Sequence, residues 1–127
     1  MPLVRIALPQ DLADRQVADI SDAVHDALVR IFEVPAKDRF QVLTRHSPQE
    51  LVYPPEYLGI VHGSRVALVQ ITCSEGRSIE KKKALYSALA SGVEAHGAIK
   101  AADVIVNLVE VKKENWSFGN GIAQYVT

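Results

Sequence analysis

One pattern of secondary structure occurs twice along the chain, and this repeat limits the possible folds more than any other feature. Strand, helix and strand patterns follow one another in residues 2–8, 14–32 and 39–45. The same order returns in residues 65–73, 78–97 and 103–111. Apolar residues alternate in the strands and recur every three or four positions in the helices. The sequence therefore predicts one domain, residues 1–127, built from two pseudo-repeats of about residues 2–60 and 61–127.

The ends of the elements carry their own signals. Asp11 and Asp14 are both suitable N-caps for the first helix. Ser78 is a suitable N-cap for the second helix, which is expected to end at Gly97. The last residues, 116–127, predict a turn followed by a short final strand.

The repeat also predicts how the strands are arranged. The two strands of a strand-helix-strand unit run parallel, with a right-handed crossover. Two units side by side make a four-stranded mixed sheet with both helices on one face, an α/β (α+β) fold. Strand 103–111 is nearly continuous in apolar residues, which predicts a central place in this sheet. In a chain with 48% hydrophobic residues, the face without helices is expected to be buried against neighbouring subunits.

Charge and hydropathy exclude several classes of partner. The formal net charge of -1 gives no electrostatic basis for binding nucleic acid or an anionic membrane. No apolar run approaches the roughly 18 residues of a membrane span, and no signal peptide is visible. The single cysteine, Cys73, cannot form an internal disulfide and is typical of a reducing, cytoplasmic location.

The second residue has two interpretations. Proline is tolerated at the first position of a strand, so Pro2 can simply mark where pairing begins. If Met1 is removed, however, Pro2 becomes the chain terminus and its nitrogen becomes a secondary amine, able to act as acid, base or nucleophile. On these residues alone the structural interpretation is the commoner one.

Other candidate residues also have ordinary structural interpretations. Asp38 in AKDRF can cap the entry to a strand, and Arg77 can be an exposed loop residue. Trp116 and Phe118 are of the type that fills cores and subunit interfaces. The four histidines lack the spacing of metal ligands and no glycine-rich phosphate loop is present, so no cofactor is expected.

Three segments together give the chain a resemblance to a known family. VPAKDRFQVLTRHSP, EGRSIE and NWSFGNGIAQYVT are similar to the malonate semialdehyde decarboxylase branch of the tautomerase superfamily. A proline directly after Met1 and two tandem strand-helix-strand units are typical of the superfamily as a whole. The resemblance covers essentially the whole chain.

The resemblance implies a site and its residues. It implies that Met1 is removed and that Pro2 is the catalytic amine. It makes Asp38 the acid that steers the proton of this amine, and Arg77 the residue that binds the substrate carboxylate. The aromatic wall of the family's pocket falls on Trp116, Phe118 and Tyr125.

The sequence departs from the family at one position. The best-known decarboxylases carry a second arginine two positions before the one that falls on Arg77, whereas this chain has Glu75 there. A carboxylate at this position is expected either to repel an anionic substrate or to form an ion pair with Arg77.

The resemblance implies a decarboxylase of malonate semialdehyde or a similar small 3-oxo acid, with hydratase activity on unsaturated three-carbon acids, assembled as a homotrimer. Decarboxylation needs an electron sink at the carbonyl, which Pro2 can supply as a protonated amine or as an iminium ion. One alternative is a keto-enol tautomerase of phenylpyruvate-like acids, in which uncharged Pro2 shuttles a proton. Another is a non-catalytic oligomer with the same fold.

Overall fold

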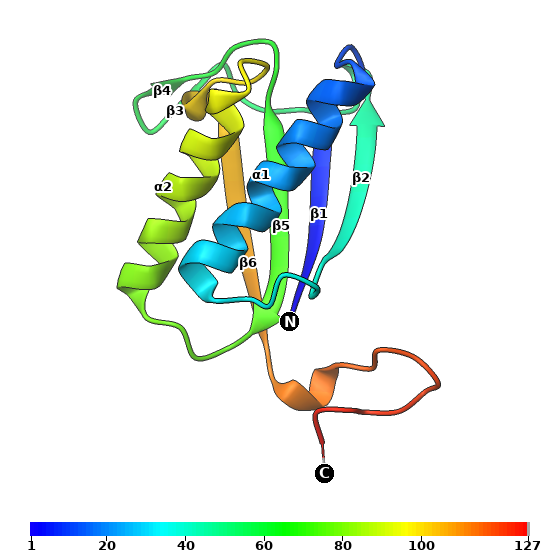
Figure 1. Cartoon of the computed structure of the whole chain (residues 1–127). Helices are drawn as coiled ribbons and strands as arrows, with labels where there is room; N and C mark the ends of the chain where they lie inside the picture. Colours follow the sequence, from blue (N-terminus) through cyan, green and yellow to red (C-terminus); the bar gives the residue numbers. More distant parts are fainter. Residues whose placement is uncertain (127) are drawn as a thin grey trace.

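The computed structural model describes residues 1–126, which form one four-stranded sheet with two helices across one of its faces (Figure 1). The strands lie in the order β2-β1-β5-β6. They cover Phe40–His46, Pro2–Pro9, Ala67–Ser74 and Val104–Val111, respectively. The two outer pairs are parallel and the central pair, β1 with β5, is antiparallel. This is the mixed sheet predicted from the repeat.

The two helices begin and end for identifiable reasons. Helix α1 (Asp14–Phe32) begins after Ala13, so neither Asp11 nor Asp14 is its N-cap. The Gln16 side chain accepts the free Ala13 N–H at 2.9 Å instead, which satisfies one of the amides left open at a helix start. Helix α2 (Ile79–Ala95) begins as predicted, because the Ser78 hydroxyl accepts the Lys81 N–H at 3.2 Å.

The core lies between the helices and the sheet. It consists of one face of β1 and β5 together with the apolar stripes of both helices, including Val4, Ile6, Ile71, Leu28 and Leu89. Each buried aliphatic side chain of this size contributes about 1.5–3 kcal/mol, which makes this layer the main source of stability. Helix α1 buries nine residues and α2 three, so α1 is the more deeply seated helix.

Strand β6 lies at an edge of the sheet, so the prediction of a central place was wrong. Its apolar run has a different cause. Val104, Val106 and Leu108 pack against the core under α2. The residues between them, such as Ile105 and Val109, point to the face that carries no helix, since side chains alternate along a strand. The apolar run therefore reflects two apolar faces of an edge strand, which pairs with β5 alone in the sheet of residues 1–126.

A long connection joins the two halves at the end of the sheet where β1 finishes. It contains a small antiparallel hairpin, β3 (Glu56–Tyr57) with β4 (Ile60–Val61), that stands apart from the main sheet (Figure 1). The hairpin turns through Leu58 and Gly59, which have φ values of 52° and 80°. Leu58 is 83% exposed, so the hairpin carries apolar side chains outward.

The C-terminal segment extends away from the sheet (Figure 1). After the 3-10 helix η2 (Lys113–Asn115), residues 116–126 form turns, and none of these described residues lies in a strand. The predicted final strand was therefore wrong for this part of the tail, because a strand requires a partner edge and the tail lies beyond the end of the sheet. Thr127 lies outside the described residues. Among residues 1–126, no helix has the length and apolar character needed to cross a membrane.

Candidate active site

The start of the chain, the end of β5 and the end of β6 meet at one end of the sheet (Figure 1). Pro2 is buried and lies directly opposite Cys73 in the antiparallel pairing of β1 with β5. The α1-β2 loop, residues 33–39, reaches the same end because Phe40 pairs with Leu3. The predicted catalytic residues come from these segments.

Asp38 lies beside the start of the chain. Its Oδ2 atom is 3.8 Å from the amino nitrogen of Met1, and its side chain is 18% exposed. Its Oδ1 atom is buried and has no hydrogen-bond partner among residues 1–126. A buried acceptor without a partner is uncommon in folded proteins and calls for an explanation.

Cys73 is buried and lies beside Pro2 on the neighbouring strand. Burial raises the pKa of its thiol, an effect that nearby Arg77 opposes and Glu110 reinforces. The thiol therefore stays neutral at physiological pH and acts as a small apolar side chain, as its apolar surroundings in the sequence suggested.

Arg77 lies in the loop between β5 and α2 and is held in place by backbone carbonyls. Its guanidinium donates to the Ser74 carbonyl at 3.1 Å and to the Phe32 carbonyl, the end of α1, at 3.4 Å. It also stacks over the Phe32 ring, 4.5 Å from the centroid. A cation at a helix C-terminus is favourable, and it fixes the direction of this arginine.

Glu75 does not pair with Arg77. No ion pair joins the two residues in the described part of the chain, and the Glu75 side chain is exposed. Its backbone N–H donates to the Val111 carbonyl at 3.0 Å, which ties the loop to the end of β6. Of the two expectations for this carboxylate, the ion pair with Arg77 was wrong.

The predicted aromatic residues form one cluster in the tail. Trp116 and Phe118 are stacked, with centroids 5.6 Å apart and planes at 16°. Tyr125 meets the edge of Phe118 at 5.0 Å. The Trp116 indole N–H donates to the Ser74 hydroxyl at 3.3 Å, and this bond joins the cluster to the loop that carries Arg77.

Two residues of this region were missed in the sequence. Phe40 is the first residue of β2, two positions after Asp38. Its ring centroid lies 6.4 Å from that of Phe118, and the residue is 47% exposed. The alternation of strand 39–45 placed Phe40 on one face, but only the fold brings the tail to it. Ser74 binds both Arg77 and Trp116, a role that depends on the ends of β5 and β6 lying together.

The predicted residues are thus brought together in two linked groups. Pro2, Asp38 and Arg77 surround the start of β1 and the end of β5. Trp116 joins them through Ser74, whereas Tyr125 is connected only through Phe118. The tail lies to one side of the sheet end, so in one chain the site is open.

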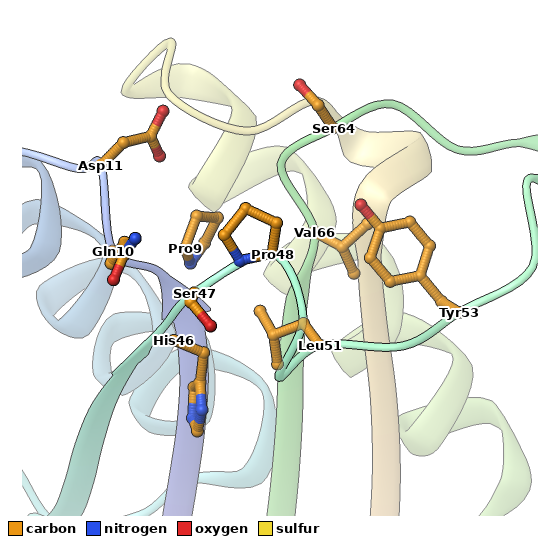
Figure 2. A pocket seen from close by; sticks show the side chains of 10 residues that line it. All are labelled: Pro9, Gln10, Asp11, His46, Ser47, Pro48, Leu51, Tyr53, Ser64 and Val66. Carbon is orange, nitrogen blue, oxygen red and sulfur yellow. The ribbon is translucent and has the colours of Figure 1, made fainter.

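Three hollows of the single chain lie at the opposite end of the sheet, about 23 Å away along the seven residue steps of β1. One has a volume of about 340 Å³ and is lined by apolar and polar side chains, among them Pro9, Pro48 and Tyr53 (Figure 2). Tyr53 uses its hydroxyl to donate to the Gly63 carbonyl at 2.9 Å. None of the predicted site residues lines this hollow.

The sequence matches two models of tautomerase enzymes. One covers residues 38–119 and the other residues 2–59. The chain is 32% identical to the probable tautomerase YusQ of Bacillus subtilis (strain 168), over 99% of each chain. It is also 32% identical to the probable tautomerase YrdN of the same organism, over 100% of this chain and 98% of the relative.

Solved structures agree with this result. FG41 malonate semialdehyde decarboxylase inhibited by 3-bromopropiolate superposes with a TM-score of 0.92 and 37% identity, over 98% of this chain and 94% of that one. A second malonate semialdehyde decarboxylase, described with decarboxylase and hydratase activities, superposes with a TM-score of 0.89 and 37% identity, over 97% of this chain and 95% of that one. A fused 4-OT, described as a symmetric trimer, superposes with a TM-score of 0.78 and 25% identity, over 94% of both chains.

These likenesses extend along the whole chain and include both repeats and the tail. They make the protein an enzyme of the isomerase or lyase type, which sets aside the non-catalytic alternative. The chain belongs to the tautomerase superfamily, and its fold is that of the malonate semialdehyde decarboxylases.

Proposed function

We propose that this enzyme decarboxylates malonate semialdehyde or a similar small 3-oxo acid without a cofactor, using the amine of Pro2 after Met1 is removed. The observation that carries the proposal is the half-buried Asp38 carboxylate beside the start of the chain, whose buried Oδ1 atom has no hydrogen-bond partner among residues 1–126. The likeness to two malonate semialdehyde decarboxylases, 37% identical along nearly the whole chain, supports this substrate class.

Pro2 supplies the electron sink in this mechanism. When the bond between the α-carbon and the carboxylate breaks, carbon dioxide leaves and the electron pair moves toward the carbonyl. A protonated Pro2 stabilises that charge by donating a hydrogen bond to the carbonyl oxygen, or Pro2 first condenses with the aldehyde to an iminium ion. The resulting enol or enamine then takes a proton at the α-carbon. Asp38 favours the cationic amine that the first route requires.

Arg77 orients the carboxylate that leaves. Two of its N–H groups already donate to the Ser74 and Phe32 carbonyls, so the guanidinium approaches a substrate with its remaining donors. A very tight grip on the departing carboxylate would stabilise the ground state and add no rate. The aromatic cluster of Trp116 and Phe118 excludes water from the reacting carboxylate, which favours loss of its charge as carbon dioxide.

We propose a homotrimer as the working form. The sheet face without helices exposes apolar side chains such as Val42 and Val109, at 37% each. Burial of such a face against copies of the same chain supplies hydrophobic stabilisation that one chain lacks. A relative described as a symmetric trimer has the same fold. A neighbouring subunit would also close the open side of the site beside the tail.

The alternative is a keto-enol tautomerase of phenylpyruvate-like acids. The two Bacillus relatives named as probable tautomerases favour it, and so does the presence of Phe40 beside Phe118, which widens the aromatic surface available to a substrate ring. In this reaction Pro2 acts as an uncharged base that moves a proton between carbon and oxygen.

The two activities are separated by one experiment. Protein shown by mass spectrometry to lack Met1 is assayed for release of carbon dioxide from malonate semialdehyde and for ketonisation of enol-phenylpyruvate. Titration of the Pro2 amine by nuclear magnetic resonance, with labelled proline, accompanies both assays. A cationic amine at neutral pH with turnover of the semialdehyde supports the decarboxylase. An uncharged amine with turnover of the enol alone contradicts it.

A further inference from the structure

Helix α1 carries two buried polar side chains that the proposed mechanism does not use. Ser21 is 6% exposed and His25 is 7% exposed. Residues four apart on a helix lie on the same side, and here both side chains bind the segment that holds Asp38. The other buried polar pair of side chains, His62 and Asp103, lies at the opposite end of the sheet.

His25 holds the loop before Asp38. Its Nε2 atom lies 2.8 Å from the carbonyl oxygen of Ala36, two residues before the aspartate. A carbonyl can only accept, so Nε2 carries a proton and donates it. Because the histidine is buried, loss of this donor would remove a contact that fastens the loop to α1.

Ser21 holds the chain after Asp38. Its hydroxyl accepts from Arg39 at 2.8 Å, and Arg39 also pairs with Asp22 at 2.7 Å. The same hydroxyl donates to the amide oxygen of Gln41, whose amide nitrogen donates to the Ser21 carbonyl at 3.1 Å. The segment is therefore bound to α1 on both sides of the aspartate, before it through the Ala36 carbonyl and after it through the side chains of Arg39 and Gln41.

The Asp38 carboxylate has no such fastening of its own. Its Oδ1 atom has no hydrogen-bond partner among residues 1–126, and its Oδ2 atom lies 3.8 Å from the amino nitrogen of Met1, the residue before Pro2. The backbone of the loop therefore sets its position. Through His25 and Ser21, α1 contributes to the position of that backbone, together with the pairing of Phe40 with Leu3 and the bond from the Asp38 N–H to the Pro35 carbonyl.

We propose that His25 is a positioning residue, which holds the loop through the Ala36 carbonyl so that the Asp38 carboxylate stays beside the start of the chain, where Pro2 becomes the terminal amine once Met1 is removed. Its effect on turnover rests on the proposed function, whereas its effect on the amine does not. Other charged groups lie at this end, among them Glu75, Arg77, Lys82 and Glu110, and Lys81, which pairs with Glu33 of the same loop at 3.3 Å. None of these forms a hydrogen bond or ion pair with His25 in the described chain, so we infer that His25 acts through the loop that carries Asp38.

The test compares three variants of the protein that lacks Met1. His25→Leu removes the donor, His25→Gln keeps an N–H donor, and His96→Leu changes a histidine beyond the end of α2, with 37% side-chain exposure, that does not contact the loop. We expect His25→Leu to lower the midpoint of the Pro2 amine titration by roughly half a pH unit or more, because the carboxylate is held less closely. The turnover number should fall about tenfold with KM within about twofold, as for a defect in positioning. His25→Gln should recover most of both losses, and His96→Leu should change neither.

The proposal is overturned if His25→Leu lowers thermal stability but leaves the Pro2 titration and kcat as in the parent protein. If His25→Leu does not fold, imidazole nitrogen spectra of the parent decide, since an Nε2 atom without a proton contradicts the bond to Ala36. If the parent turns over none of the acids tested, the proposed function fails. The shift in the Pro2 titration then still decides the role of His25.

Discussion

Two aspartates occupy matching places in the two halves of the molecule but differ in their partners. Asp38 precedes β2 and Asp103 precedes β6, the outer strand of each half. Because β1 and β5 are antiparallel, the two lie at opposite ends of the sheet. Asp103 is 4% exposed and accepts from the Gly63 N–H at 3.0 Å and from His62 at 3.3 Å. Asp38 has a buried oxygen without a partner in the described residues.

The difference distinguishes a carboxylate that holds the fold from one available to a ligand or an amine. Asp103 fastens the connection between the halves, and the approach is so close that a Cβ atom on Gly63 would lie 3.1 Å from its Oδ2 atom. A glycine suits this place because a Cβ atom would crowd the carboxylate. Asp38 lies at the end where the chain starts, with one oxygen still able to accept a proton or a hydrogen bond.

The largest expected effect comes from moving the amine. One residue added before Pro2, in protein that keeps it, should lower kcat/KM by roughly a thousandfold or more, because the proline nitrogen becomes an amide and loses its acid-base chemistry. The circular dichroism spectrum should stay unchanged. The same residue added after Thr127 is the control. Full activity with a blocked Pro2 would contradict the role of the amine.

The two aspartates should respond in opposite ways to loss of charge. Asp38→Asn should lower kcat by roughly a hundredfold, as expected when a charge that steers a proton is removed. Its free energy of unfolding should change by less than about 1 kcal/mol, because no hydrogen bond is lost. Steady-state kinetics and urea denaturation of the same preparations measure the two quantities.

Asp103→Asn should instead lower the free energy of unfolding by about 1–3 kcal/mol, since a buried, charged acceptor of two bonds is replaced by an amide. Its kcat should stay within about twofold of the parent. A catalytic loss in Asp103→Asn that equals the loss in Asp38→Asn would mean that the two ends of the sheet do not differ in this way.

The fold was largely predictable from the sequence because the repeat combines two periodicities, that of a strand and that of a helix. The error over β6 arose because an apolar run looks the same whether neighbouring strands or an open apolar face surround it. The N-cap of α1 was misplaced because Gln16, rather than an aspartate, satisfies the first free amide.

The site was only partly predictable. Pro2, Asp38 and Arg77 could be named from the resemblance, and the fold brings them to one end. The bonds of His25 and Ser21 could not be foreseen, because they join residues eleven and eighteen positions apart through the turn after α1. One of the two expectations for Glu75 was an ion pair with Arg77. In the described chain the Arg77 guanidinium donates to two backbone carbonyls instead.

The anion anchor should show a smaller effect than the aspartate at the chain start. Arg77→Ala should raise KM for malonate semialdehyde by roughly tenfold to a hundredfold, the loss expected for hydrogen bonds to a charged group. Arg77→Lys keeps the charge without the forked donors and is the matched variant, expected to recover part of the loss. An unchanged KM in Arg77→Ala would exclude the residue as the anchor.

Glu75→Arg tests the position at which the chain departs from its relatives. The exposed Glu75 side chain repels an anion, and an arginine would attract it, so KM should fall several-fold with a smaller change in kcat. The experiment measures both constants at low and at high salt. An unchanged KM at low salt would mean that this side chain points away from the substrate.

The smallest expected effect concerns Cys73, the cross-strand partner of Pro2. Burial raises the pKa of its thiol in the folded state. The neutral thiol therefore contributes stability that is complete below the pKa of the unfolded thiol, about 8.5, and is lost as pH rises through the folded value. Between pH 7 and 10, the free energy of unfolding should fall more steeply in the parent than in Cys73→Ala. Parallel curves from urea denaturation would contradict this.

The antiparallel pairing of β1 with β5 has a consequence for stoichiometry. It relates the halves by an approximate two-fold rotation, so the second half begins near Val66 and Ala67 at the far end of the sheet. If the halves were separate chains, each would bring its own free amino terminus to the sheet, whereas a single continuous chain brings only one. Covalent joining thus removes one of two possible reactive ends. At the end of the sheet where β5 begins, the connecting loop and its buried His62–Asp103 pair take the place of a chain terminus.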